Sequence, residues 1–335
     1  MSAVQASPLC TIAIPVYHRM EKDLAFAAVE SALTEWGPDV ELLVIDDHTT
    51  DGTWEHLCRL VGDGRARLLR NEHNLGLFQN FNRCLDEAHG RYVRILCSDD
   101  VLEPGSLGVE LEVIERHPDI ALLTTRGRRV AADGAVLGLQ ATALPEGYYR
   151  GERAIAAVLR ANVHTGYNSL NYPSGVLLRR AAADAAGRFR TDMRVSGDVE
   201  YFLRVLRQGG LGVLDHVGCR VTVHADQVGS RLSGQPFVVA EMFELVEGFH
   251  DVLNGQVDPG ELRRGMGGLS IWQSLRSAMR GQPGLAAASL AMARQHGARA
   301  MDLAAGFAGF LTRRARWALR GPSAPGQVRP ERALR

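Results

Sequence analysis

The stretch RILCSDDVLEPGS, residues 94–106, joins an apolar run to two consecutive aspartates. The run from Val93 to Cys97 has the composition of a buried strand, and Asp99 and Asp100 follow it almost at once. Neighbouring carboxylates repel each other, and an aspartate is seldom fully buried without a partner. Either water solvates this pair in a loop, or a cation lies between the two side chains.

Apolar runs and helical patterns alternate through the first hundred residues. Strands are expected at 9–14, 40–45, 66–70 and 91–97, and helices at 22–35, 53–61 and 75–89. Strands that are apolar throughout and separated by helices indicate a parallel sheet covered on both faces. The predicted fold class is therefore α/β, with a mainly parallel sheet.

The pattern changes after residue 119. The sequence predicts a strand at 120–125, a hairpin turning on Asp133-Gly134, a helix near 152–160, a strand at 175–179 and a helix from Asp198 to Gln208. Beyond about Pro236 the chain has few strand signals and is expected to be a C-terminal helical region. Residues 321–335, GPSAPGQVRPERALR, have the composition of a disordered tail.

The composition argues against several classes of protein. The 335 residues carry 38 Lys+Arg and 38 Asp+Glu, whereas a protein built to coat nucleic acid is basic overall. The five cysteines form no CxxC pair, which argues against a zinc site or a disulfide framework. The N-terminus lacks a signal-peptide pattern, and the low-charge stretch 303–311 is too short to span a bilayer. We expect a soluble cytoplasmic protein that binds no nucleic acid.

Acidic pairs follow two of the expected strands. Asp46 and Asp47 end the second strand, as Asp99 and Asp100 end the fourth, and ligands bind beyond the carboxyl ends of such strands. Mg²⁺ and Mn²⁺ take carboxylate oxygens together with substrate phosphates. The pattern indicates a Mg²⁺ or Mn²⁺ site that holds a diphosphate; the alternative is that strand ends simply collect solvated aspartates.

Two other folds of this layout do not match the chain. A dinucleotide-binding domain needs GxGxxG after its first strand, where residues 15–22 read PVYHRMEK. A phosphate-receiver domain has its acidic pair after the first strand, but here the pair follows the second. A nucleotide-sugar-dependent transferase remains.

Four stretches resemble, in order, the motifs of the family 2 inverting glycosyltransferases, which have the GT-A fold. They are IAIPVYHR (12–19), VIDDHTTDGT (44–53), NLGLFQNFNRCLDEAHGRY (74–92) and LCSDDVLEPGSL (96–107). The resemblance covers residues 9–235. Cys97 departs from it, because many members carry Asp there, and His18 departs where Asn is common.

The resemblance implies a role for each of several residues. The donor nucleotide would be bound by Pro15, Tyr17, Asp47, Asn74 and Asp99, and the metal by Asp99, Asp100 and His224. Which of Asp99 and Asp100 contacts the metal and which the ribose stays open. For His224 the alternative is a structural histidine.

SGDVEYFLRVLRQGG (196–210) is similar to the family helix whose Asp is the catalytic base, which implies that role for Asp198. Gly197 stands where the family has Glu. Inverting transfer is an in-line displacement, so a carboxylate opposite the leaving diphosphate must take the acceptor's proton. The alternative is a plain helix N-cap, for which Asp is well suited. Residues 162–175, NVHTGYNSLNYPSG, form either a sugar pocket facing Asp198 or a polar surface loop.

The sequence thus predicts a GT-A catalytic domain over 1–235, a helical region over 236–320 and a disordered tail over 321–335. The expected activity is metal-dependent inverting transfer from a nucleotide-diphosphate-sugar donor to a glycan, lipid-linked or small-molecule acceptor, as in polysaccharide biosynthesis. A degenerate domain that only binds a nucleotide-sugar or a partner is the alternative, consistent with Cys97, Gly197 and His18. Residues 299–320 form either a basic amphipathic helix on the inner membrane face or a helix packed on the protein's core.

Overall fold

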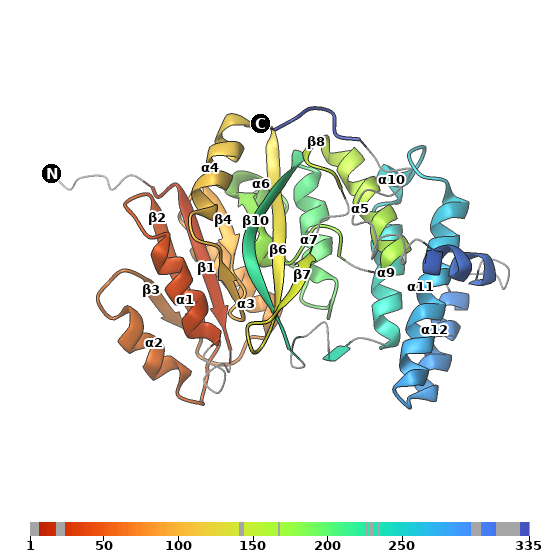
Figure 1. Ribbon diagram of the computed structural model, residues 1–335, viewed down its shortest axis with the longest axis horizontal. Helices are drawn as coiled ribbons and strands as arrows, with labels where there is room; N and C mark the ends of the chain where they lie inside the picture. The colour runs from red at the N-terminus through yellow and green to blue at the C-terminus, as the bar shows by residue number, and fades with distance from the viewer. Residues whose placement is uncertain are drawn as a thin grey trace.

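The computed structural model describes residues 7–17, 24–140, 144–166, 168–224, 227, 231–232, 235–295, 303–312 and 329–334. A central sheet carries helices on both faces, and the C-terminal helices lie at the end of the molecule opposite β3 (Figure 1). The α/β fold with a C-terminal helical region, predicted from the sequence, is confirmed.

The sheet of the described chain has ten strands. They are β1 (Cys10–Val16), β2 (Val40–Asp46), β3 (Arg67–Arg70), β4 (Tyr92–Ile95), β5 (Asp100–Leu102), β6 (Ile120–Ala131), β7 (Val136–Gln140), β8 (Gly147–Tyr149), β9 (Val176–Arg179) and β10 (Gly210–Val223). Their order is β3-β2-β1-β4-β9-β6-β10-β5, with β7 beside β6 and β8 beside β10. Six of them, β1, β2, β3, β4, β6 and β10, run in one direction.

Two hydrophobic clusters lie on opposite faces of the sheet, because successive strand residues point to opposite sides. On one face α1 (Leu24–Thr34), α2 (Thr53–Val61) and α4 (Ser106–Arg116) pack on residues such as Ile12 and Ile14. On the other face α3 (Leu77–Glu87), α5 (Gly151–Thr165) and α7 (Gly197–Leu206) pack on residues such as Val93 and Leu178. The short α6 (Arg180–Ala185) follows β9.

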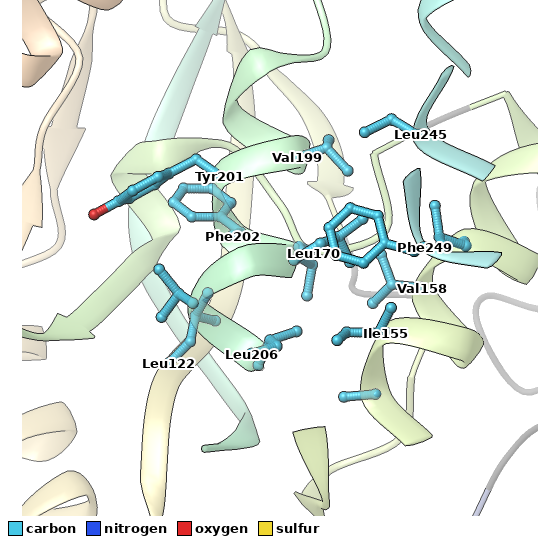
Figure 2. Packing of buried hydrophobic residues seen from close by; sticks show 14 of the residues in the cluster. Leu122, Ile155, Val158, Leu170, Val199, Tyr201, Phe202, Leu206, Leu245 and Phe249 are labelled. Carbon is cyan, nitrogen blue, oxygen red and sulfur yellow. The ribbon is translucent and has the colours of Figure 1, made fainter. Parts of the chain in front are cut away.

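The C-terminal helices share the second of these clusters. They are α9 (Pro236–Gly248), α10 (His250–Leu253), α11 (Pro259–Met279) and α12 (Pro283–Gln295). Figure 2 shows Val199 of α7 beside Leu245 of α9, with Val158 of α5 and Phe249 close by. The helical region is therefore continuous with the core of the sheet.

Residues 303–312 form a further helix that packs on α11. Leu303 and Phe310 are buried, and the ring of Phe310 lies 6.0 Å from that of Trp272. Leu303 and Phe310 therefore face the protein's own core, as one of the two alternatives expected, whereas Leu311 is exposed; 299–302 and 313–320 lie outside the described residues. Among the described helices, none is both long and apolar enough to cross a membrane.

Part of the predicted disordered tail is ordered. The Tyr148 N–H donates to the Arg332 carbonyl at 2.9 Å, the Arg332 guanidinium pairs with Asp119 at 2.6 Å, and Leu334 is buried. The prediction of disorder over 321–335 is therefore wrong for 329–334, because these residues bind to β8, an edge strand far away in the sequence.

Strand β1 continues through Pro15, where the sequence predicted its end. The Ala13 carbonyl accepts from Leu96 N–H on the β4 side, and Val16 accepts from Asp47 on the β2 side. By this alternation Pro15 faces the β4 side beyond Ile95, where β4 has ended. Proline is therefore placed just beyond the last paired residue of β4, where strands tolerate it.

Candidate active site

The carboxyl ends of β1, β2 and β4 meet at one edge of the sheet. The register places Val16 beside Asp46 and Ala13 beside Ile95. Pro15 is buried within β1, whereas Tyr17, just beyond the strand, is 42% exposed. Pro15, Tyr17 and Asp47, three of the residues predicted to bind the donor nucleotide, therefore lie at the same edge of the sheet.

Asp47 is held by the protein itself. Its Oδ1 accepts from Asn71 Nδ2 at 2.6 Å and from Leu75 N–H at 2.8 Å, and its Oδ2 accepts from Gly76 N–H at 2.9 Å. These bonds tie the end of β2 to the start of α3. Asp47 thereby anchors the loop that carries the exposed Asn74.

Cys97, Asp99 and Asp100 form a compact group of donor atoms within 4.8 Å of one another. Asp100 is buried: its Oδ2 accepts from Ser174 Oγ at 2.6 Å, and its Oδ1 accepts from Thr222 N–H at 3.2 Å. It opens β5, a strand that the sequence analysis missed and that pairs antiparallel with β10.

The pairing of β5 with β10 brings His224 to this group. His224 follows the end of β10, and its Nε2 lies 3.0 Å from Asp99 Oδ2. No strand was predicted between Gln208 and Pro236, yet the 14-residue β10 lies there and delivers the imidazole. The structure thus brings His224 to Asp99, at the side of the group formed by Cys97, Asp99 and Asp100.

The donor set suits a divalent cation. Carboxylate oxygens are preferred by Mg²⁺ and Mn²⁺, and imidazole is accepted by transition metals. The Nδ1 atom of His224 is buried and has no hydrogen-bond partner among the residues that the structure describes. Burial, aided by the charges of Asp100 and Asp99, raises the pKa of the Cys97 thiol well above its ordinary value. Asp99 and Asp100 are therefore the anionic ligands that these residues offer.

Asp198 lies in the first turn of α7, half-buried. The helix begins at Gly197 with Ser196 at the N-cap position, so the alternative that Asp198 is the cap is wrong. Its Oδ1 accepts from Val199 N–H at 2.8 Å and its Oδ2 from Asn168 Nδ2 at 3.3 Å. Burial raises the pKa of Asp198 to about 6, and the negative charge of Glu241 also raises it. The hydrogen bonds from Val199 and Asn168 act in the opposite direction and lower this pKa.

Residues 168–174 link the two groups of carboxylates. Asn168 donates to Asp198 and also to the Asn171 carbonyl at 2.8 Å, while Ser174 donates to Asp100. Asn171 and Ser174 are buried, so the alternative of a polar surface loop is wrong for them. Asn168 and Ser174 were not singled out from the sequence; their only signal was a stretch rich in amides and hydroxyls.

Gly197 stands at a close contact between α7 and α3. A Cβ atom on Gly197 would lie 2.7 Å from ring atoms of Phe78, in the first turn of α3. Any side chain there would displace the ring or the helix. This contact accounts for glycine at a position where the resembling motif has glutamate.

Other residues of the resembling motifs serve the fold. Asn82 exchanges hydrogen bonds with the backbone of Phe189, at 3.0 and 2.7 Å. A Cβ on Gly90 would lie 2.4 Å from Thr11 N, so only glycine fits between α3 and β4. His18 lies outside the described residues.

The sequence matches the model of one protein family, described as Glycosyl transferase family 2, over residues 11–184. The chain is 30% identical over 224 residues to an uncharacterized protein of Mycobacterium tuberculosis, MT1568, covering 64% of this chain and 67% of that protein. It is 26% identical over 217 residues to the succinoglycan biosynthesis protein ExoO of Rhizobium meliloti, covering 62% of this chain and 58% of that protein. The family match takes in more than half of the chain, which therefore belongs to glycosyltransferase family 2.

Two solved structures share the fold. TarS 1–349 of S. aureus, in complex with UDP-GlcNAc, superposes with a TM-score of 0.62 at 16% identity and covers 97% of this chain and 99% of that one. Mannosyltransferase PcManGT from Pyrobaculum calidifontis, in complex with GDP-Man and Mn²⁺, gives 0.51 at 17% identity over 94% and 82%. The chain is a glycosyltransferase with the GT-A fold.

Proposed function

We propose that this glycosyltransferase transfers a sugar, with inversion, from a nucleotide-diphosphate-sugar to an acceptor hydroxyl. A divalent cation would bind at Asp99 and Asp100, and Asp198 would be the general base. The observation that carries the proposal is the segment 168–174, whose Ser174 binds Asp100 and whose Asn168 binds Asp198. One rigid connection between the two carboxylate groups is what a common reaction centre requires.

Asp198 has the properties of a base that works at neutral pH. With a pKa of about 6 it is ionised there, yet it is more basic than an ordinary aspartate. The acceptor oxygen forms a bond to the anomeric carbon as the bond to the diphosphate breaks, and its proton passes to the Asp198 carboxylate. Hydrogen bonds from Val199 and Asn168 fix the direction of that carboxylate.

Asp99 is the direct metal ligand in this proposal. Its side chain is more open than that of Asp100, whose oxygens are held inward by Ser174 and Thr222. A divalent cation bound there would neutralise the negative charge that develops on the leaving diphosphate. The Mn²⁺ in the PcManGT complex supports divalent metal use; either Mg²⁺ or Mn²⁺ suits these ligands.

The nucleotide would bind along the strand ends, at Pro15, Tyr17, Asp47, Asn74 and Asp99. The UDP-GlcNAc and GDP-Man complexes of the two structural relatives support a nucleotide-sugar donor. Likeness to ExoO supports a glycan acceptor in polysaccharide biosynthesis, with lipid-linked and small-molecule acceptors as alternatives. We propose a cytoplasmic location because none of the five cysteines forms a disulfide.

The test is calorimetric titration with UDP-, dTDP- and GDP-sugars, with and without Mn²⁺, followed by assay of nucleoside diphosphate release. We expect metal-dependent binding of one donor class, loss of that dependence in Asp99→Asn, and its retention in the control Asp133→Asn, which alters an exposed hairpin turn. Unchanged metal-dependent affinity in Asp99→Asn would refute the metal assignment. Donor binding with no release of nucleoside diphosphate, even with glycan, lipid-linked and small-molecule acceptors present, would instead indicate a degenerate binding domain.

A further inference from the structure

Glu241 of α9 is a buried carboxylate directed at the loop before α7. Its Oε1 accepts from Arg194 N–H at 2.6 Å, and its Oε2 accepts from Val195 N–H at 3.1 Å and from Ser196 N–H at 2.7 Å. The residue is 6% exposed. A buried carboxylate is costly unless hydrogen bonds compensate it, and here three successive backbone groups do so.

The N-terminus of α7 has no capping bond from its own N-cap side chain, and Glu241 supplies a hydrogen bond there. Backbone N–H groups at a helix start have no partner within the helix, and they attract negative charge. Ser196 occupies the N-cap position but makes no capping bond with its side chain. The carboxylate of Glu241 binds the Ser196 N–H instead, two residues before Asp198.

Packing fixes α9 against the same part of the chain. Leu245, one turn beyond Glu241, lies beside Val199 in the hydrophobic cluster (Figure 2). At the other end of the loop, the Arg194 guanidinium lies 5.0 Å from the centre of the Phe237 ring. Helix α9 therefore contacts the loop 194–196 through a buried carboxylate and an aromatic ring, and it packs on α7 through an aliphatic side chain.

We propose that Glu241 is a positioning residue for glycosyl transfer: it holds the loop 194–196, and thereby the first turn of α7, so that Asp198 faces the reaction centre. This inference rests on the proposed role of Asp198 as base. It makes the C-terminal helices part of the catalytic unit, although the family match ends at residue 184.

The charge of Glu241 also bears on the acidity of the base. Burial is the main cause of the raised pKa of Asp198, and the negative charge of Glu241 raises it further. Two other ionisable groups lie near Asp198. Glu200 of α7 is paired with Arg204 at 2.8 Å. Cys97, after β4, keeps its proton because burial raises its pKa. Removing the Glu241 charge should therefore make Asp198 more acidic.

The test compares Glu241→Gln and Glu241→Asp with Glu247→Gln, a change on the exposed side of the same helix. We expect Glu241→Gln to lower kcat roughly 10- to 100-fold, the cost of a misplaced catalytic group, with little change in KM for the donor. The acid limb of its pH profile should move to lower pH. Glu241→Asp should lower kcat but keep the acid limb of the pH profile near that of the unmodified protein. Glu247→Gln should match the unmodified protein in kcat, in KM and in its pH profile.

Two measurements separate positioning from general damage. The double variant Asp198→Asn/Glu241→Gln should be no slower than Asp198→Asn alone, because residues that act through one another are non-additive. Amide hydrogen exchange at 194–196 should be faster in Glu241→Gln than in Glu247→Gln, a readout that needs no substrate. Should Glu241→Gln not fold, Glu241→Asp serves for both comparisons.

An unmodified kcat and pH profile in the Glu241 variants, or losses that multiply in the double variant, would overturn the proposal. If the unmodified protein releases nucleoside diphosphate from no donor, the proposed function fails instead. In that case, unchanged amide hydrogen exchange at 194–196 in Glu241→Gln would still show that Glu241 does not hold the loop.

Discussion

At the scale of single residues, the aspartates of this site differ because their surroundings differ. Asp47 accepts three hydrogen bonds from the protein and anchors a loop. Asp100 is held inward by Ser174 and Thr222, whereas Asp99 is more open and lies against His224. Asp198 has a half-buried carboxyl whose pKa is raised to about 6, mainly by burial. The same side chain can therefore anchor a loop, as Asp47 does, or take one of the proposed roles of metal ligand and base.

The pKa of Asp198 leads to a prediction for the pH dependence of the reaction. Below about pH 6 the carboxyl is protonated and cannot accept a proton, so kcat/KM should fall about tenfold per pH unit there. Asp198→Asn should lower kcat by about two to four orders of magnitude and remove this limb from the remaining activity. Steady-state kinetics across the pH range measure both effects, and normal turnover by Asp198→Asn would show that another carboxylate is the base.

The same shift has a consequence for stability. Because the folded-state pKa is raised above the unfolded value, the folded protein favours the protonated carboxyl, and stability is lost as pH rises from the unfolded pKa through about 6. Asn carries no charge at any pH. Asp198→Asn should therefore melt at a higher temperature than the unmodified protein in alkaline buffer, with a difference that shrinks toward acid pH.

At the scale of elements, the site depends on how closely α7 approaches α3. Phe78, in the first turn of α3, fills the space in front of Gly197. The start of α3 is tied to Asp47 through Gly76, and the start of α7 carries Asp198. The two helix N-termini therefore connect the edge where the carboxyl ends of β1, β2 and β4 meet with Asp198, the proposed base.

Gly197→Ala tests this contact. The added Cβ would meet the Phe78 ring at 2.7 Å, and we expect a loss of about 1–3 kcal/mol in the free energy of unfolding, together with a lower kcat. Gly108→Ala is the matched control, because its Cβ meets nothing within 4 Å on the exposed side of α4. The control should be neutral or more stable by up to about 1 kcal/mol, since alanine favours helix. Equal stability of the two variants in denaturant titrations would contradict the close contact.

At the scale of the whole molecule, the C-terminal helices complete the core of the sheet. Val239, Leu245 and Leu262 belong to the same cluster as Val93 of β4 and Phe202 of α7. The Glu261 carboxylate of α11 binds both Arg160 and His164 of α5, at 2.7 and 2.8 Å. The boundary at residue 235, proposed for the catalytic domain, therefore cuts through one continuous core.

Truncation tests this continuity. A chain ending at residue 235 would expose the apolar surface that α9 and α11 cover, and we expect it to lose cooperative thermal unfolding. A chain ending at residue 328 loses the burial of Leu334, worth about 1.5–3 kcal/mol, and the Arg332–Asp119 pair, and should still unfold cooperatively. A cooperative transition in the shorter chain would mean that residues 1–235 form an independent domain.

The sequence by itself determined the strand ends and the acids that follow them. The runs 40–45 and 91–97 are mostly apolar. Asp46-Asp47 follow the first run at once and Asp99-Asp100 follow the second after Ser98, so local composition was enough to place both pairs at one edge. The hairpin on Asp133-Gly134 could likewise be predicted from the sequence, because its turn residues are local signals.

The tertiary structure decided which distant residues meet those acids. His224 reaches Asp99 through the pairing of β10 with β5, Asn168 reaches Asp198 across 30 residues, and Glu241 reaches the loop 194–196 from a helix some 45 residues on. No local pattern marks such contacts, because a carboxylate, an amide or an imidazole looks the same in sequence whether it faces water or a partner. Strand pairing and helix packing bring these groups together, and burial then raises the pKa of Asp198.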